Sequence, residues 1–185
     1  DLMRLITGAE PVRIFGMGGQ KLNHLEERYG NEVPDVLDSA YVSVSFDNGI
    51  NAMLELCMFG EGARFQERIS ALGELATLEA RVPGPGRFEP DGVSKPAEYA
   101  VSRRPCHPHG HGETVSVEHV DEALLGAGDH HGSTFFQHQQ FARIARGGGV
   151  PVVTVEDGLR AVAMGLAAQH SIATGMPVEM QDFSI

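Results

Sequence analysis

The stretch Tyr41-Val-Ser-Val-Ser-Phe-Asp-Asn-Gly-Ile-Asn-Ala-Met-Leu-Glu-Leu56 decides the fold. Its first half alternates apolar with more polar residues, which is the period of a β-strand that has one buried face. Asp47-Asn48-Gly49 then breaks the pattern, and Asn-Gly favours a type I′ turn between two antiparallel strands. A return strand over residues 50–59 follows. Its inward-facing set is Ile50, Ala52, Leu54, Leu56 and Met58.

Further strands are expected on both sides of this hairpin. Residues 11–16 precede it, and residues 65–72, 77–82, 97–103 and 113–120 follow it. Arg68 and Glu79 could pair across two of these strands. The outer face of the hairpin carries Tyr41, Met53 and Cys57, which predicts that a second layer or a partner subunit covers it.

The last third of the chain changes to a helical period. Residues 132–146 are expected to form a helix with one stripe that contains Phe135, His138, Phe141, Ala142 and Ala145. Thr154-Val-Glu-Asp157 has the spacing of a capping box before a second helix that ends at Gly175. A short strand over residues 177–180 can follow. The sequence therefore predicts an α+β domain with an open, mainly antiparallel sheet, helices packed on one face and oligomerisation through the other.

Composition excludes several classes of protein. The chain has 185 residues, 14 Lys+Arg against 25 Asp+Glu, and a formal net charge of -11. This acidic balance argues against binding to nucleic acid and to anionic membrane surfaces. No apolar run approaches the roughly 20 residues that a membrane-spanning helix needs. Cys57 and Cys106 are far apart and in unlike contexts, which is typical of a reducing, cytoplasmic compartment.

Glycine and histidine provide the remaining motifs. Gly16-Met17-Gly18-Gly19 lacks the third glycine of a dinucleotide-binding loop at its proper spacing. His107, His109 and His111, with Cys106, could bind Zn, Ni or Cu weakly, or they could form an exposed loop. Asp129-His130-His131-Gly132-Ser133 precedes the first late helix. Its histidines could line a pocket, or the segment could serve capping, with Asp129 or Ser133 as the N-cap.

The chain begins within a helical pattern. Leu2, Leu5 and Ile6 have helical spacing, and Gly8 is a natural C-cap. This start indicates a piece of a longer protein, although a processed N-terminus would look the same.

Four segments resemble one enzyme family in the family's own order. They are Asp1-Leu-Met-Arg-Leu5, the hairpin through Asp47-Asn48-Gly49 and Leu54-Glu55-Leu56, Gly132–Phe141 and Val155–Val178. Together they resemble the C-terminal domain of the glucose–fructose oxidoreductase / inositol dehydrogenase / rhizopine-catabolism family (Gfo/Idh/MocA). The resemblance covers essentially the whole chain, residues 1–185, as a substrate-binding and oligomerisation domain.

This resemblance implies a two-domain oxidoreductase. A preceding Rossmann domain would bind NAD or NADP, and the reaction would be hydride transfer to or from a sugar, cyclitol or similar polyol. The family's glycine loop and Glu-Lys-Pro motif are absent here. Its catalytic His lies in an H-x-x-D pattern whose Asp corresponds to Asp1, so that His falls upstream. The chain is therefore expected to hold no catalytic residue, no cofactor and no metal, and to be inactive alone.

Substrate-wall residues are then placed by position in the family. The turn Phe59-Gly-Glu61-Gly62 is interpreted as one pocket edge, and the loop His130-His131 leading into Phe135 as another. The expected partners are a sugar or polyol substrate and further copies of the chain, contacted through the open sheet face. The alternative is a stand-alone binding or interaction module, with metal bound through the histidine-rich loop.

Overall fold

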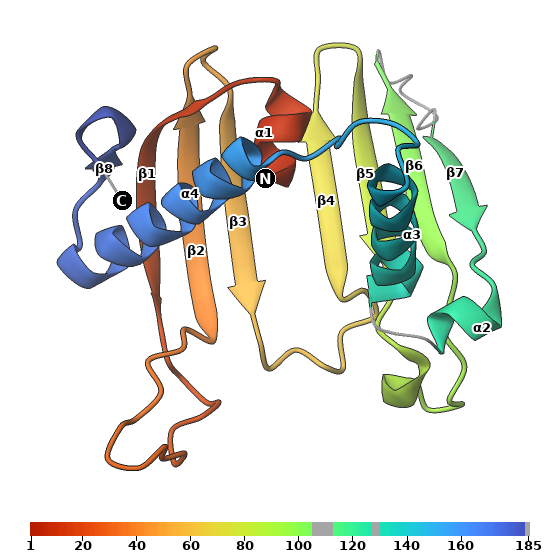
Figure 1. Cartoon of the computed structure of the whole chain (residues 1–185), viewed down its shortest axis with the longest axis horizontal. Coiled ribbons are helices and arrows are strands. Elements are labelled where there is room, and N and C mark those ends of the chain that lie inside the picture. The colour runs from red at the N-terminus through yellow and green to blue at the C-terminus, as the bar shows by residue number, and fades with distance from the viewer. Residues whose placement is uncertain (105–112, 127–129, 184–185) are drawn as a thin grey trace. The chain divides into compact units, whose positions relative to one another are not determined.

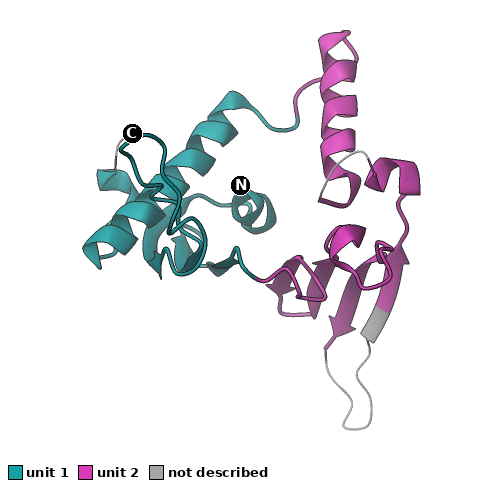
Figure 2. Ribbon diagram, turned by 90° about the horizontal axis from the view of Figure 1, so that it is seen from below, with its two compact units in different colours: residues 1–59, 152–185 teal, residues 60–151 magenta. Residues whose placement is uncertain are grey.

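The computed structural model describes residues 1–104, 113–126 and 130–183. The chain divides into two compact units, coloured separately in Figure 2. Unit 1 contains residues 1–59 and 152–185, and unit 2 contains residues 60–151. Each unit has its own four-stranded sheet in which the paired strands are antiparallel. The α+β class and the antiparallel pairing are confirmed, but the strands form two sheets rather than one.

Unit 1 joins the two ends of the chain in one sheet with the strand order β3-β2-β1-β8 (Figure 1). Its elements are α1 (Leu2–Thr7), β1 (Pro11–Gly19), β2 (Ser39–Phe46), β3 (Asn51–Cys57), α4 (Val155–Thr174), β8 (Val178–Glu179) and the 3₁₀ turn η3 (Met180–Asp182). The long helix α4 crosses one face of this sheet and packs on β1. The core between them contains Ile14, Ala40, Val42, Val44, Phe46, Ala167 and Val178.

The β2–β3 hairpin is confirmed, but its turn is not of type I′. The loop has three residues, 47–49: Gly49 N–H donates to Phe46 O at 3.0 Å, and Phe46 N–H donates to Ile50 O at 2.9 Å. Gly49 alone among them takes a positive φ, 84°. This is a three-residue loop closed by a glycine bulge. Asn48 stays outside the left-handed region, and its amide donates to Thr7 O at 3.1 Å, which fixes the turn against α1.

The glycine run belongs to strand β1, which continues to Gly19 beyond its expected end. Gly16 N–H donates to Ser171 Oγ of α4 at 2.9 Å, and Ser171 is fully buried. A Cβ on Gly16 would lie 2.8 Å from Ile172 Cγ1. Gly16 therefore allows the helix to approach the sheet, because any side chain at position 16 would separate the two layers.

Asp38 holds in place the loop of residues 20–38, which connects β1 to β2. Its side chain is fully buried, and its carboxylate accepts N–H bonds from Lys21, Leu22 and Asn23 at 2.7, 2.6 and 2.8 Å. Burial alone would raise the pKa of this carboxyl, but the backbone donors outweigh that effect and the net pKa is lowered. One ionised side chain therefore satisfies three consecutive backbone N–H groups of a loop that has almost no regular structure.

Both ends of α4 are as the sequence predicts. Thr154 Oγ1 accepts the N–H of Asp157 at 3.2 Å, and Asp157 Oδ2 accepts the N–H of Thr154 at 2.9 Å, which completes the capping box. Gly175 ends the helix with φ 70°. In the part of the chain that the structure describes, no helix combines the length and apolar character needed to cross a membrane.

Unit 2 contains the sheet β4-β5-β6-β7 and the short helical elements that follow it. Its elements are β4 (Glu67–Leu72), β5 (Ala76–Val82), the 3₁₀ turn η1 (Gly86–Phe88), β6 (Ala97–Arg103), β7 (Glu113–Glu118), α2 (Glu122–Leu125), the 3₁₀ turn η2 (His130–Gly132) and α3 (Ser133–Ala145). α3 has no buried residue. The predicted stripe on α3 therefore contains no fully buried residue in this chain.

Two local expectations in unit 2 are wrong. Arg68 lies opposite Arg81, and Glu79 lies opposite Ser70, so Arg68 and Glu79 are not directly paired. Arg81 instead forms ion pairs with Glu79 on its own strand and with Glu98 on the next. The N-cap of α3 is Gly132 rather than Ser133, and Asp129, the other expected cap, lies outside the described residues.

Candidate functional site

The segment before α3 holds three consecutive residues in the left-handed region. The φ angles are 60° at His130, 52° at His131 and 84° at Gly132. This backbone costs a residue with a side chain about 1–2 kcal/mol. Gly132 is also buried, and a Cβ there would lie 3.1 Å from Val120 Cγ1. The chain therefore takes a defined and costly conformation at the predicted histidines, which is a feature concentrated at functional sites.

His130 has a partner that is 63 positions away in the sequence. Its Nδ1 lies 2.7 Å from Oε1 of Glu67, the first residue of β4. The two side chains are 58% and 42% exposed. Because an ionised carboxylate can only accept hydrogen bonds, this contact requires a hydrogen on Nδ1 of His130. No local pattern in the sequence indicates this contact, because Glu67 and His130 are 63 positions apart.

His131 turns inward rather than outward. Its Nε2 is buried and has no hydrogen-bond partner among the described residues. The ring lines a cavity of about 10 Å³, enough for a single water molecule, together with Pro83, Gly84, Pro85, Ser94, Leu125 and His130. Burial lowers the pKa of His131, because the charged imidazolium would lose hydration there. The neighbouring histidines are therefore distinct: His130 is exposed and His131 is half-buried.

The other predicted site residues are divided between the two units. Phe59 is half-buried and closes the first segment of unit 1, whereas Glu61 is exposed on the turn that opens unit 2. Phe135 lies on the first turn of α3, where its ring meets that of Phe136 edge to face at 5.6 Å. Within unit 2 the structure brings His130 and His131 together and adds Glu67 to them.

Phe59 lies far from α1 within unit 1. The hairpin turn of residues 47–49 contacts α1 through Asn48, and β3 then runs its full length before the chain reaches Phe59. The seven residues of β3, at about 3.3 Å each, separate the hairpin turn from the end of the strand near Phe59. Phe59 is therefore at the opposite end of the sheet from that contact.

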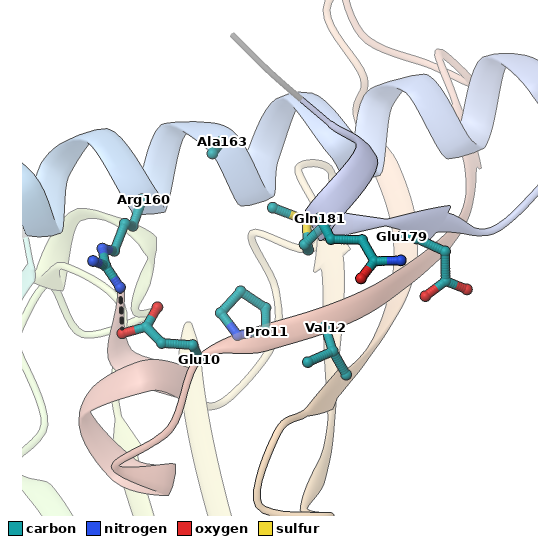
Figure 3. A pocket seen from close by; sticks show the side chains of 8 residues that line it. Glu10, Pro11, Val12, Arg160, Ala163, Glu179 and Gln181 are labelled. Atoms are coloured by element: carbon teal, nitrogen blue, oxygen red, sulfur yellow. Dashed lines mark ion pairs between the residues drawn. The ribbon is translucent and has the colours of Figure 1, made fainter.

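A larger cavity lies in unit 1, and the sequence gives no indication of it (Figure 3). Its volume is about 420 Å³, within the usual range for small-molecule sites. It forms because β8 pairs with only Arg13 and Ile14 of β1 before the chain turns away into η3. The lining residues are Glu10, Pro11, Val12, Arg160, Ala163, Glu179, Met180 and Gln181.

The charged groups of this cavity are paired with one another or with their neighbours. Glu10 Oε1 lies 2.9 Å from Arg160 Nη1 and 2.7 Å from Arg4 Nη2. The hydrogen bond from Arg4 lowers the pKa of Glu10 and outweighs the opposing effect of burial, and Arg160 lowers it further. Glu179 is paired with Arg13. The charged side chains that line the cavity, Glu10, Arg160 and Glu179, therefore all form ion pairs, and the other lining residues are Pro11, Val12, Ala163, Met180 and Gln181.

A metal centre is not found among the described residues: no group of three or more His, Cys, Asp and Glu side chains there could hold an ion. The loop with His107, His109 and His111 lies outside the described part of the chain, so that metal hypothesis stays a prediction. Cys57 is exposed and free.

Several solved oxidoreductase structures contain a similar fold. Levoglucosan dehydrogenase in complex with NADH and levoglucosan is 19% identical, with a TM-score of 0.66 over 97% of this chain and 47% of that one. An Agrobacterium radiobacter oxidoreductase in complex with NAD+, L-tartaric acid and magnesium is 18% identical, with a TM-score of 0.59 over 98% and 46%. The aldose-aldose oxidoreductase of Caulobacter crescentus, complexed with glycerol, is 16% identical, with a TM-score of 0.56 over 96% and 43%.

The chain spans less than half the length of each of these proteins. No match is found among curated proteins. The family model for the oxidoreductase family, C-terminal alpha/beta domain, matches residues 1–180. With nearly the whole chain matched and the antiparallel α+β fold in place, the protein belongs to the Gfo/Idh/MocA oxidoreductase family through its C-terminal alpha/beta domain.

Proposed function

We propose that this chain is the substrate-binding and oligomerisation domain of an NAD(P)-dependent oxidoreductase that transfers hydride to or from a sugar, cyclitol or similar polyol. The observation that carries the proposal is the family match over residues 1–180. Nucleotide-bound neighbours of roughly twice this length support it, since the part of those proteins that lies outside the alignment is large enough for a cofactor domain.

In this proposal the chain supplies one wall of the pocket. Phe59, Glu61, His130, His131 and Phe135 are its proposed substrate-contacting residues. Polar side chains would hold substrate hydroxyls, and aromatic rings would cover the apolar face of the carbon skeleton. Their contribution to the reaction is orientation of the carbinol toward the nicotinamide. The nicotinamide and the proton-transfer groups belong to the preceding domain.

Two assays test whether substrate binding belongs to this chain and cofactor binding to the preceding domain. The full-length protein should oxidise polyols such as myo-inositol or levoglucosan with NAD or NADP, whereas the 185-residue chain should show no turnover. Calorimetric titration of NAD into this chain should give no measurable binding. Micromolar binding of NAD to the chain would refute our placement of the cofactor, and a full-length protein with no activity on any polyol would refute the substrate class.

The proposed oligomer forms through the face of the unit 1 sheet that lies opposite α4. Phe15, Met17 and Tyr41 alternate with the buried residues of β1 and β2 and therefore point to that face, and Met53 of β3 lies opposite Ser43 on the same face. Met17, Tyr41 and Met53 are exposed. Exposed large apolar side chains on one flat surface are typical of a subunit contact. We expect a dimer or larger assembly by light scattering, and Met53→Glu should dissociate it. A monomeric wild-type protein would contradict this proposal.

The proposed location is a reducing, cytoplasmic compartment, which the exposed free thiol of Cys57 supports.

A further inference from the structure

The structure joins Glu67 and His130 in a way that the proposed function does not use. Glu67 begins β4 and His130 lies in the turn before α3, so the contact ties the sheet of unit 2 to the start of its last helix. The carboxylate and the ring nitrogen are 2.7 Å apart, a normal distance for a charge-assisted hydrogen bond.

The chemistry of the pair fixes the state of the ring. A carboxylate accepts and does not donate, so the hydrogen between them belongs to Nδ1 of His130. The other nitrogen, Nε2, then carries a lone pair and acts as an acceptor. Neutral imidazole in water favours the opposite tautomer, with the hydrogen on Nε2. The contact with Glu67 therefore changes Nε2 of His130 from a hydrogen-bond donor to a hydrogen-bond acceptor.

The backbone holds this acceptor in place. His130 and His131 both take the left-handed conformation, and His131 packs inward against the cavity lined by Pro83 and Leu125. The inward packing of His131 restrains the backbone, and the hydrogen bond to Glu67 of β4 restrains the ring of His130. The His130 ring is therefore oriented before a ligand binds. More than half of the His130 side chain remains exposed, at 58%.

We propose that Glu67 is a positioning residue that locks His130 in the Nδ1–H tautomer, and that His130 Nε2 accepts a hydrogen bond from a hydroxyl group of the ligand. The ligand class, a polyol or sugar, rests on the proposed function above. Glu67 acts only through His130. No covalent step and no net proton transfer are involved, because the ligand O–H donates and keeps its hydrogen.

The tautomer is measured on the 185-residue chain itself by nitrogen-15 NMR of labelled histidine at about pH 8, where an ordinary imidazole is neutral. Wild-type His130 should show the Nδ1–H form. Glu67→Ala should move it toward the Nε2–H form, and Glu67→Gln should largely retain it, because the amide oxygen still accepts. Glu55→Ala is the matched control, since that strand carboxylate bonds Tyr41 in unit 1 and should leave His130 unchanged.

The ligand contact is tested in the full-length protein by measuring KM and kcat separately for each variant. His130→Ala should raise KM for the polyol roughly five- to tenfold, the loss of one hydrogen bond, with kcat nearly unchanged. Glu67→Ala should raise KM about two- to threefold, and Glu67→Gln should restore it.

Two results overturn the proposal: an Nε2–H tautomer in the wild-type chain, or an unchanged KM in His130→Ala while the wild-type protein oxidises the polyol. Failure of the proposed function has a separate signature, in which the wild-type protein oxidises no polyol at all while the NMR spectrum still shows the Nδ1–H tautomer.

Discussion

Arg4 and Asp157 are 153 positions apart in the sequence, and Nη1 of Arg4 lies 3.2 Å from Oδ1 of Asp157. The same guanidinium contacts Asp1 at 3.2 Å and Glu10 at 2.7 Å. Its side chain is only 11% exposed. One arginine therefore joins α1, the entry to β1 and the first turn of α4, and the two ends of unit 1 depend on it.

Replacing Arg4 tests this cluster. Arg4→Met leaves Glu10 and Asp157 without their shared cation, and we expect unit 1 to lose about 2 kcal/mol of stability in urea unfolding. Arg13→Met is the matched control, because Arg13 also pairs with a glutamate but is 59% exposed. Arg13→Met should lower the free energy of unfolding by less than about 1 kcal/mol. Equal losses in both variants would contradict a special role for Arg4.

Acid should weaken unit 1 through Asp157. The Thr154 hydroxyl and backbone N–H and the Arg4 guanidinium hold the pKa of Asp157 at about 2, below the ordinary 3.8. A depressed pKa means that the unfolded chain takes up the proton first, so this stability is present above pH 3.8 and is lost as the pH falls toward 2. Unfolding midpoints measured across that window should fall in the wild type. Asp157→Asn should flatten the slope, and an unchanged slope would refute the assignment.

His131 should produce a second pH response, of the same sign but in a higher window. Burial lowers its pKa below the ordinary 6.5, so the unfolded chain binds the proton more readily than the folded chain. Stability is complete above pH 6.5 and declines as the pH falls below it. A histidine NMR titration should show His131 protonating only below the ordinary histidine pKa of 6.5. His131→Gln should remove this part of the pH dependence, and a His131 signal that titrates at or above pH 6.5 would contradict burial.

Gly132 should tolerate no side chain. Gly132→Ala must adopt φ 84° and bring its Cβ within 3.1 Å of Val120, so we expect a loss of about 1–2 kcal/mol in unfolding experiments. Gly165→Ala in α4 is the control, since that position is helical and has open space around a Cβ. Alanine there should stabilise by up to about 1 kcal/mol. A neutral Gly132→Ala would show that the turn before α3 can relax.

Patterns among residues that are close together in the sequence were sufficient to predict much of the fold. The β2–β3 hairpin, the capping box of Thr154 and Asp157 and the ends of α4 are all specified by residues within a few positions of one another. Alternation and helical period report local backbone geometry directly, because each side chain's direction follows from its own strand or helix. The family resemblance, confirmed over residues 1–180, rests on the same local segments.

Tertiary structure decided the pairings. The division into two sheets, the position of Arg68 opposite Arg81 and the burial of Asp38 beneath a loop all depend on the path of the chain between elements. A strand's sequence fixes its faces but not its neighbour or its register. The bond between Glu67 and His130 is the clearest case, since a strand carboxylate and a loop imidazole 63 residues apart have no shared pattern until the sheet and the turn before α3 place them 2.7 Å from each other.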